Sequence, residues 1–251
     1  MKKMLLIPFL IGILSSVYAS EKIELYVAAK AGLSLRDKPD VKATSLTKIP
    51  YGTKITITYP VETVSIISEG MRGSWVTTTF GGKTGYVVDV YLLPVVPPKA
   101  EVKTLSQYLA QLSAPFGSKL IIKSDEKTTD ESEWELHKQL YKNGNEWHHF
   151  EGYEYGSDTY FLPKLTIPQG FLLLRLIPEF KDVWNDKDEF PIESKTIKKG
   201  ETEYGIKVEK EMPGDFPWVK MIKIEFAKGA VYYFEIYQID NQLVIFYGAG
   251  V

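Results

Sequence analysis

The sequence predicts a mainly β protein in two parts: a small barrel over residues 20–93, then a second, mainly antiparallel β domain over residues 102–251 with one leading α-helix. Three observations predict it. The chain holds 16 Tyr, 12 Phe and 5 Trp, and aromatic residues are enriched in strands. Short β-branched runs are separated by glycines, which indicates strands with tight turns. In the stretch YLLPVVPPKAE the prolines cannot donate to a sheet, so we expect a Pro-rich linker over residues 94–101.

The chain opens with MKKMLLIPFLIGILSSVYAS, a short cationic start followed by an apolar run and small residues ending at Ala19. This pattern is typical of a secretory signal peptide, here residues 1–19. The apolar run is shorter than the roughly 20 residues that a spanning helix needs, and no other segment approaches that length. We therefore expect an exported protein, periplasmic or secreted, that is not an integral membrane protein.

Charge and cysteine content exclude several function classes. Without Lys2 and Lys3, the chain keeps 28 basic and 32 acidic side chains, a net charge of −4. That balance offers no electrostatic basis for binding nucleic acid. The chain has no cysteine, which excludes a disulfide framework, a lipid attached to an N-terminal cysteine and a Cys nucleophile.

The segment from Trp75 to Tyr91 has the pattern of a hairpin. Val76, Thr78 and Phe80 alternate with threonines, as a half-buried strand requires. Gly81-Gly82 supplies the positive φ values of a tight turn, and Gly85 allows close backbone approach. In the returning strand we expect one face to carry Tyr86, Val88 and Val90, and the other Val87, Asp89 and Tyr91.

Four stretches in this region resemble the bacterial SH3 family: AGLSLRDKP, YGTKITI, GSWVTTTF and GKTGYVVDVYL. Members of that family run through Gly-Leu-Asn-Val-Arg-x-x-Pro, Gly-Thr-x-Val, Gly-Trp-x-x-Val and Gly-x-x-Gly-Tyr-Val. The matching residues are Leu33, Leu35, Arg36, Pro39, Gly52, Thr53, Trp75, Val76, Gly82, Gly85, Tyr86 and Val87. The chain departs from the pattern at Ser34, where Asn is usual, at Ser74, inserted before Trp75, and in an insert over residues 60–73. The resemblance covers residues 23–93, and no family is recognised for residues 102–251.

The resemblance implies an SH3-like barrel that acts as a binding module for peptidoglycan peptides or protein segments. In this sequence the candidate cleft is aromatic, because flat rings with polar tips suit a peptide backbone lying across them. The candidate cleft residues are Tyr26, Tyr51, Tyr59, Trp75 and Tyr91. The alternative for Trp75 and Tyr86 is that they fill the barrel interior.

The second part begins with KTLSQYLAQL, whose leucines and tyrosine fall at i, i+3, i+4 and i+7 after Thr104. This spacing predicts one amphipathic helix with Thr104 and Gln107 at capping-box positions. The run FLLLRLI, residues 171–177, suits a central strand, and GAVYYFEIYQIDNQLVIFYG reads as two strands joined near Asp240-Asn241. The acidic stretch SDEKTTDESEWE is expected to be a solvated loop or helix start.

The residues give no motif for catalysis or for a metal, so no cofactor is expected. Zinc hydrolases need two or three His ligands at recognisable spacing, and the adjacent His148 and His149 point to opposite faces of a strand, with only His137 besides. A serine triad lacks its Gly-x-Ser-x-Gly elbow. EFKDVWNDKDEF lacks the glycine of an EF-hand loop and favours a solvated turn. The aromatic residues of WHHFEGYEYGSDTYF, which include Trp147, Tyr153, Tyr155 and Tyr160, are expected to pack across strands more often than to stack on sugars.

The sequence therefore predicts an exported, non-catalytic binding protein whose first domain recognises a cell-wall peptide or an envelope protein segment. Two alternatives stay open. One is an envelope hydrolase with a pair of carboxylates in residues 102–251. The other is a carrier of a small molecule or lipid, which would need an apolar cavity in the second domain. The sequence does not indicate an oligomeric state.

Overall fold

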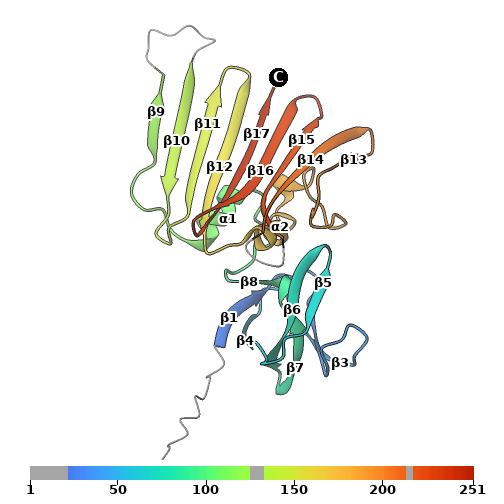
Figure 1. Ribbon diagram of the computed structural model, residues 1–251. Helices are drawn as coiled ribbons and strands as arrows, with labels where there is room; N and C mark the ends of the chain where they lie inside the picture. The colour runs from blue at the N-terminus through green and yellow to red at the C-terminus, as the bar shows by residue number, and fades with distance from the viewer. Residues whose placement is uncertain (1–21, 125–132, 213–216) are drawn as a thin grey trace, which may run out of the picture.

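The computed structural model describes residues 22–124, 133–212 and 217–251. Within these residues the chain forms two antiparallel sheets and two α-helices (Figure 1), which confirms the mainly β fold. Neither sheet closes on itself in the described part of the chain. The expected signal peptide and most of the acidic stretch SDEKTTDESEWE lie outside the described residues. None of the described helices is long and apolar enough to cross a membrane.

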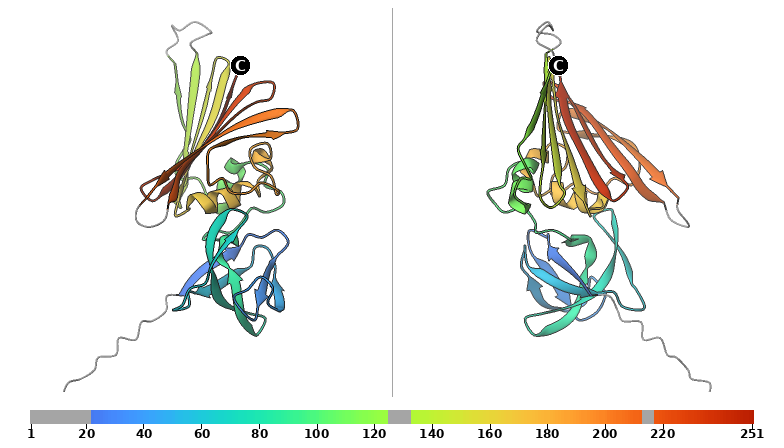
Figure 2. Two further views of the ribbon diagram at one scale, coloured as in Figure 1. Left: turned by 45° about the vertical axis from the view of Figure 1, so that its right-hand side comes forward. Right: turned by 90° about the vertical axis from the view of Figure 1, so that its left-hand side faces the viewer.

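The first sheet has eight strands in the order β3-β2-β7-β6-β4-β1-β8, with β5 paired to β6. Its strands curve around a compact core that includes Val27, Leu35, Ile57, Val76 and Val87 (Figure 2). The strands are β1 (Lys22–Val27), β2 (Leu33–Arg36), β3 (Ser45–Ile49), β4 (Lys54–Thr58), β5 (Ser65–Ser68), β6 (Met71–Phe80), β7 (Lys83–Val88) and β8 (Leu92–Leu93), with a 3-10 turn, η1 (Asp89–Tyr91), before β8.

The β6–β7 hairpin follows the sequence prediction up to Val88. Gly81 and Gly82 have φ values of +57° and +74° and turn the chain between the paired residues Phe80 and Lys83. At Gly85 a Cβ would lie 2.3 Å from the carbonyl oxygen of Arg36, so only glycine fits. The expected alternation of faces through Tyr91 is wrong, because β7 ends at Val88 and residues 89–91 form η1.

The insert over residues 60–73 forms a hairpin of its own. Its β5 pairs with the first half of β6, and the turn between them is Glu69-Gly70 with φ values of +50° and +76°. At Gly70 a Cβ would lie 2.5 Å from the carbonyl oxygen of Phe190. The Phe190 N–H donates to the Glu69 carbonyl oxygen at 2.8 Å, so the tip of the insert docks on the second part of the chain.

The second sheet has nine strands in the order β13-β14-β15-β16-β17-β12-β11-β10-β9. Both helices lie on one face, at the end of the sheet next to the first sheet, and the strands fan out beyond them (Figure 2). The elements are α1 (Leu105–Leu112), β9 (Leu120–Lys123), β10 (Trp134–Leu140), β11 (Glu146–Gly152), β12 (Tyr155–Pro163), α2 (Ile167–Leu174), a 3-10 turn η3 (Pro178–Phe180), β13 (Lys195–Lys199), β14 (Thr202–Glu211), β15 (Trp218–Ala227), β16 (Val231–Ile239) and β17 (Gln242–Gly250).

Two of the predicted elements of this part are confirmed. The leading helix is α1, where the Thr104 side chain accepts from the Gln107 N–H and the Gln107 side chain accepts from the Lys103 N–H. The two strands joined near Asp240-Asn241 are β16 and β17, which pair from Val231↔Gly250 to Ile239↔Gln242.

The strand expected over residues 171–177 is wrong, because most of that run forms the second helix, α2. Thr166 and Gln169 make a reciprocal capping box at its start. Gly170 lies so close to β16 and β17 that a Cβ there would come within 2.5 Å of Leu243 and 2.7 Å of Ile236. A helix that is apolar on nearly all sides is a buried helix, and the sequence pattern alone does not separate it from a buried strand.

The two parts of the chain share one hydrophobic cluster. Ala28, Met71 and Leu93 from the first part pack with residues of α2 and of the nine-stranded sheet. Residues 94–101 are fixed to both parts, since the Tyr51 hydroxyl donates to Pro98 O at 2.8 Å and the Tyr108 hydroxyl of α1 donates to Val96 O at 2.6 Å. The Pro-rich segment is therefore anchored along its length.

Candidate functional site

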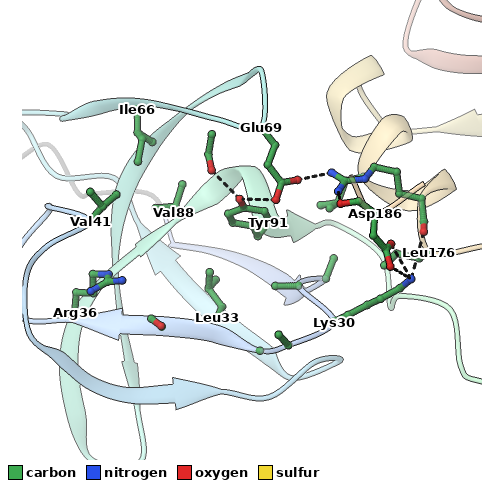
Figure 3. A pocket seen from close by; sticks show the side chains of 18 of the residues that line it. Lys30, Leu33, Arg36, Val41, Ile66, Glu69, Val88, Tyr91, Leu176 and Asp186 are labelled. Atoms are coloured by element: carbon green, nitrogen blue, oxygen red, sulfur yellow. Dashed lines mark hydrogen bonds and ion pairs between the residues drawn. The ribbon is translucent and has the colours of Figure 1, made fainter. Parts of the chain in front are cut away.

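A groove of about 480 Å³ lies between the first sheet and the C-terminal end of α2 (Figure 3). One wall is β2 with the loop before it, the second is the β5–β6 hairpin, and the third comes from α2 and the loop around Asp186. Its lining residues are Ala28, Ala29, Lys30, Ala31, Gly32, Leu33, Ser34, Arg36, Val41, Ile66, Ser68, Glu69, Trp75, Val88, Tyr91, Leu172, Arg175, Leu176 and Asp186. Both parts of the chain thus build the same groove.

Two aromatic residues, Tyr91 and Trp75, line the groove. Trp75 lies on β6 opposite Val88, and its side chain is almost wholly buried. Tyr91 follows in η1 and is half-buried. Its hydroxyl lies 2.7 Å from the Ser68 Oγ and donates to Glu69 Oε1 at 3.2 Å, and burial raises the pKa of the Tyr91 hydroxyl. The hydrogen bonds hold the Tyr91 ring against the β5–β6 hairpin.

The end of the groove next to α2 is charged. Arg175 forms an ion pair with Glu69, and it donates through Nε to Asn185 O at 3.1 Å and through Nη2 to Asp186 O at 2.6 Å. Lys30 reaches across from the first part to the Asp186 carboxylate at 3.0 Å. Figure 3 shows these contacts as a continuous row that joins the two parts beside the groove.

The opposite end is apolar. Val41, Ile66, Val88 and Leu33 line it from four different segments of the first part (Figure 3). Arg36 lies at its margin and donates to the Ala43 carbonyl at 2.6 Å, which ties the loop between β2 and β3 to β2. A ligand in the groove would therefore meet apolar side chains at one end and paired charges at the other.

Of the five aromatic residues expected in the cleft, the structure brings Trp75 and Tyr91 together in this groove. The other three lie elsewhere. Tyr51 packs on the Pro-rich segment, and burial raises the pKa of its hydroxyl to about 12. Tyr59 donates to Asp89 Oδ2 at 3.1 Å, and Tyr26 lies on β1 opposite Lys54 and Leu93.

Sequence reasoning missed every groove residue that belongs to the second part: Leu172, Arg175, Leu176 and Asp186. One signal was present, a single arginine inside the apolar run FLLLRLI. Such a charge is seldom buried without a partner, and the Arg175 side chain is only 8% exposed.

The histidines lie on the nine-stranded sheet, far from this groove in the fold. His137 and His149 are paired across β10 and β11, and His149 Nδ1 lies 3.0 Å from Asp158 Oδ1. His148 points to the other face, where it contacts Glu146. Among the residues that the structure describes, no group of three or more His, Cys, Asp or Glu could hold a metal ion.

The acidic loop after η3 is compensated by lysines. Lys30 pairs with Asp186, and two further lysines pair with Asp188 at 2.7 Å and Asp182 at 3.1 Å. These pairs engage the three aspartates of the stretch EFKDVWNDKDEF.

Aromatic residues of the stretch WHHFEGYEYGSDTYF pack within the second part of the chain. Tyr160 is a core residue, 1% exposed, and Tyr155 packs on Phe150 with ring centroids 6.1 Å apart.

Comparisons with known proteins found no relative of this chain. No protein-family model, no curated protein and no solved structure matches it.

Proposed function

We propose that this protein is an exported, non-catalytic binding protein whose first part is an SH3-like domain, and that it holds a short extended peptide of the cell wall or of an envelope protein. The observation that carries the proposal is the groove of about 480 Å³ that Trp75 and Tyr91 share with α2. That volume lies within the range of about 300 to 1,000 Å³ typical of ligand pockets.

The shape and chemistry of the groove favour a peptide. A peptide backbone needs flat aromatic surface and a few polar partners, which Tyr91, Ser68 and Ser34 offer at the centre. The apolar end suits one aliphatic side chain of the ligand. The charged end suits a polar or charged group of the ligand. The residues there form two ion pairs, Arg175 with Glu69 and Lys30 with Asp186. A charged ligand group could replace one member of a pair without leaving the other member unpaired.

The test uses the mature chain, residues 20–251, and two substitutions on the same short strand. Ile66 of β5 faces the groove, whereas its neighbour Ile67 is 75% exposed and does not line it. We expect Ile66→Glu to abolish sedimentation with purified sacculi, or to abolish photocrosslinking from a benzophenone side chain placed at Val41 in intact cells. Ile67→Glu should leave both unchanged.

Two results would contradict the proposal. The first is equal binding by the Ile66→Glu and Ile67→Glu variants, which would place the ligand away from the groove. The second is release of soluble fragments from the sacculi, which would indicate a hydrolase. Sedimentation without crosslinked protein would identify the wall as the source of the peptide, and crosslinked protein without sedimentation would identify an envelope partner.

A further inference from the structure

The two edges of the nine-stranded sheet differ in how they are protected. An edge strand presents unpaired N–H and C=O groups, and proteins commonly guard such edges with lysines. The edge strand β13 carries Lys195, Lys198 and Lys199 among its five residues. The other edge strand, β9, has a single lysine at its end, Lys123, and places three apolar residues in succession before it, Leu120, Ile121 and Ile122.

These apolar side chains are open to solvent. Leu120 is 55% exposed, Ile121 47% and Ile122 39%, on both faces of the strand, and Phe116 just before it is 61% exposed. Figure 1 shows β9 at the outer margin of the sheet, with β10 on its inner side. Exposed β-branched residues on an edge strand are the usual template for adding another strand.

The register shows which backbone groups face outward. The Ser124 N–H donates to Trp134 O at 2.9 Å, in the same register that pairs Lys123 with Glu135 and Ile121 with His137. Hydrogen-bonded and non-hydrogen-bonded pairs alternate along an antiparallel ladder. Ile121 and Lys123 therefore turn their N–H and C=O groups away from β10, toward any added strand.

Charge decides between the possible occupants of this edge. Lys119 and Lys123 lie on the same face as Ile121, two positions to either side of it. If a second copy paired through a two-fold axis at Ile121, Lys119 would lie directly opposite Lys123 twice, and like charges opposite each other destabilise a sheet. With the axis at Ile122, Lys123 would lie opposite the apolar Ile121. In neither register does Lys123 gain an acidic partner across the strands.

A strand with acidic residues at the matching positions suits this edge better. Cross-strand pairs of opposite charge stabilise a sheet, and an aspartate or glutamate opposite Lys119 and another opposite Lys123 would be four residues apart. Lys123 already pairs with Glu135 at 2.7 Å, but this lysine is 68% exposed and such a surface pair contributes little. Apolar residues between the two acids would cover Leu120 and Ile122.

We propose that β9 accepts an extended segment of another protein as a tenth strand, and that this segment has β-branched residues between two acidic residues four positions apart. The β9 edge is the edge of the sheet opposite to β13, and it is separate from the groove. The proposal therefore stands whether or not the groove binds a peptide.

The test measures the affinity of the mature chain for two labelled peptides by fluorescence anisotropy. One peptide contains Glu-Val-Thr-Val-Glu and the other Lys-Val-Thr-Val-Lys. At low salt we expect the acidic peptide to bind about tenfold more tightly, with the gap closing in 0.5 M salt, because salt screens exposed charges. Lys119→Glu should remove or reverse the preference, and circular dichroism of this exposed substitution checks that the fold is kept.

The backbone part of the proposal has its own matched pair of variants. Ile121→Pro removes the N–H that points away from β10, and an edge strand tolerates proline at such a position. We expect this variant to bind the acidic peptide at least about tenfold more weakly. Ile121→Val keeps the N–H and should bind as the parent does. Equal affinity for the two peptides, or binding that both Lys119→Glu and Ile121→Pro leave unchanged, would overturn the proposal. So would a dimer in sedimentation analysis that Ile121→Pro dissociates, since that result puts a second copy at the edge.

Discussion

The backbone N–H of Phe190 donates to the carbonyl oxygen of Glu69 at 2.8 Å, and this hydrogen bond joins the insert of the first sheet to the loop before β13. The next residue, Gly70, leaves no room for a side chain at the contact. The insert that departs from the SH3-like pattern thus attaches the first part to the second, and it places Glu69 where it meets both Tyr91 and Arg175.

Substitution of Gly70 measures this attachment. Gly70→Ala places a Cβ 2.5 Å from Phe190 O at a φ of +76°, whereas Gly82→Ala meets nothing within 4 Å at a φ of +74°. Both variants carry the backbone strain of a left-handed residue, about 1 kcal/mol. We expect Gly70→Ala to lower the free energy of unfolding in urea by about 2 kcal/mol more than Gly82→Ala does. Equal losses would mean that the tip of the insert does not dock.

The Arg175–Glu69 ion pair should contribute more than a surface pair. The Arg175 side chain is 8% exposed and packs on the Phe171 ring at 5.1 Å. Arg175→Met removes the ion pair together with the hydrogen bonds to Asn185 O and Asp186 O. Because the Glu69 side chain is 39% exposed and keeps its contact with Tyr91, we expect a cost of about 2 kcal/mol, below the roughly 3 to 5 kcal/mol of a fully buried pair. The exposed pair Lys54–Glu24 serves as the control, since Lys54→Met should change the free energy of unfolding far less in the same urea titration. A similar small loss at Arg175 would contradict the interpretation.

Truncation of Trp75 should lower the stability of the fold, so that any effect on binding follows from unfolding. Its side chain is 3% exposed, and truncating a buried tryptophan costs about 3 to 5 kcal/mol. We expect Trp75→Ala to lower the thermal midpoint of unfolding strongly and to lose the part of the near-ultraviolet circular dichroism that the Trp75 ring contributes. Tyr91→Phe, which removes only the hydroxyl that contacts Ser68 and Glu69, should cost about 1 kcal/mol. A Trp75→Ala variant as stable as Tyr91→Phe would show that the ring belongs to the groove surface rather than to the core.

Local patterns in the sequence predicted the local structure. The Thr104 cap, the Gly81-Gly82 turn and the β16–β17 hairpin each depend on residues within a few positions of one another. The run FLLLRLI predicts a strand where the structure has a helix, because a short apolar run has no period that separates a buried strand from a buried helix. The deciding contact, Gly170 against Leu243 and Ile236, lies in a distant part of the chain.

The sequence predicted the groove residues that belong to local motifs and missed those that come from a distant segment. Trp75 and Tyr91 belong to the motifs of the first part, and their positions follow from the hairpin that holds them. Arg175 and Asp186 reach the groove because the two parts pack together, through the docking of the β5–β6 insert at Phe190 and through their shared hydrophobic cluster. The sequence shows that Arg175 needs a partner, but it does not show which distant segment supplies that partner.

Glu179 is a mostly buried carboxyl in η3, and its protonation should make the stability of the protein depend on pH. Desolvation raises the pKa of Glu179 to about 7, and the nearby Asp158 raises it further, although the hydrogen bond that the carboxylate accepts from the Leu105 N–H at the start of α1 acts in the opposite direction. In the unfolded chain a glutamate titrates near about 4.3. Between these two values the folded state binds more protons than the unfolded state, so stability should fall as pH rises from about 4.3 to about 7 and then level off.

Glu179→Gln keeps an oxygen that can accept from Leu105 and removes the titration. The parent should therefore lose on the order of 1 to 2 kcal/mol relative to Glu179→Gln when urea unfolding is compared at pH 5 and pH 7.5, a figure below the full linkage value because the group keeps some solvent contact. The exposed Glu101→Gln serves as the control and should track the parent at both pH values. If the parent and Glu179→Gln keep a constant difference across this range, the Glu179 carboxyl is charged throughout, and its hydrogen bond to α1 outweighs its burial.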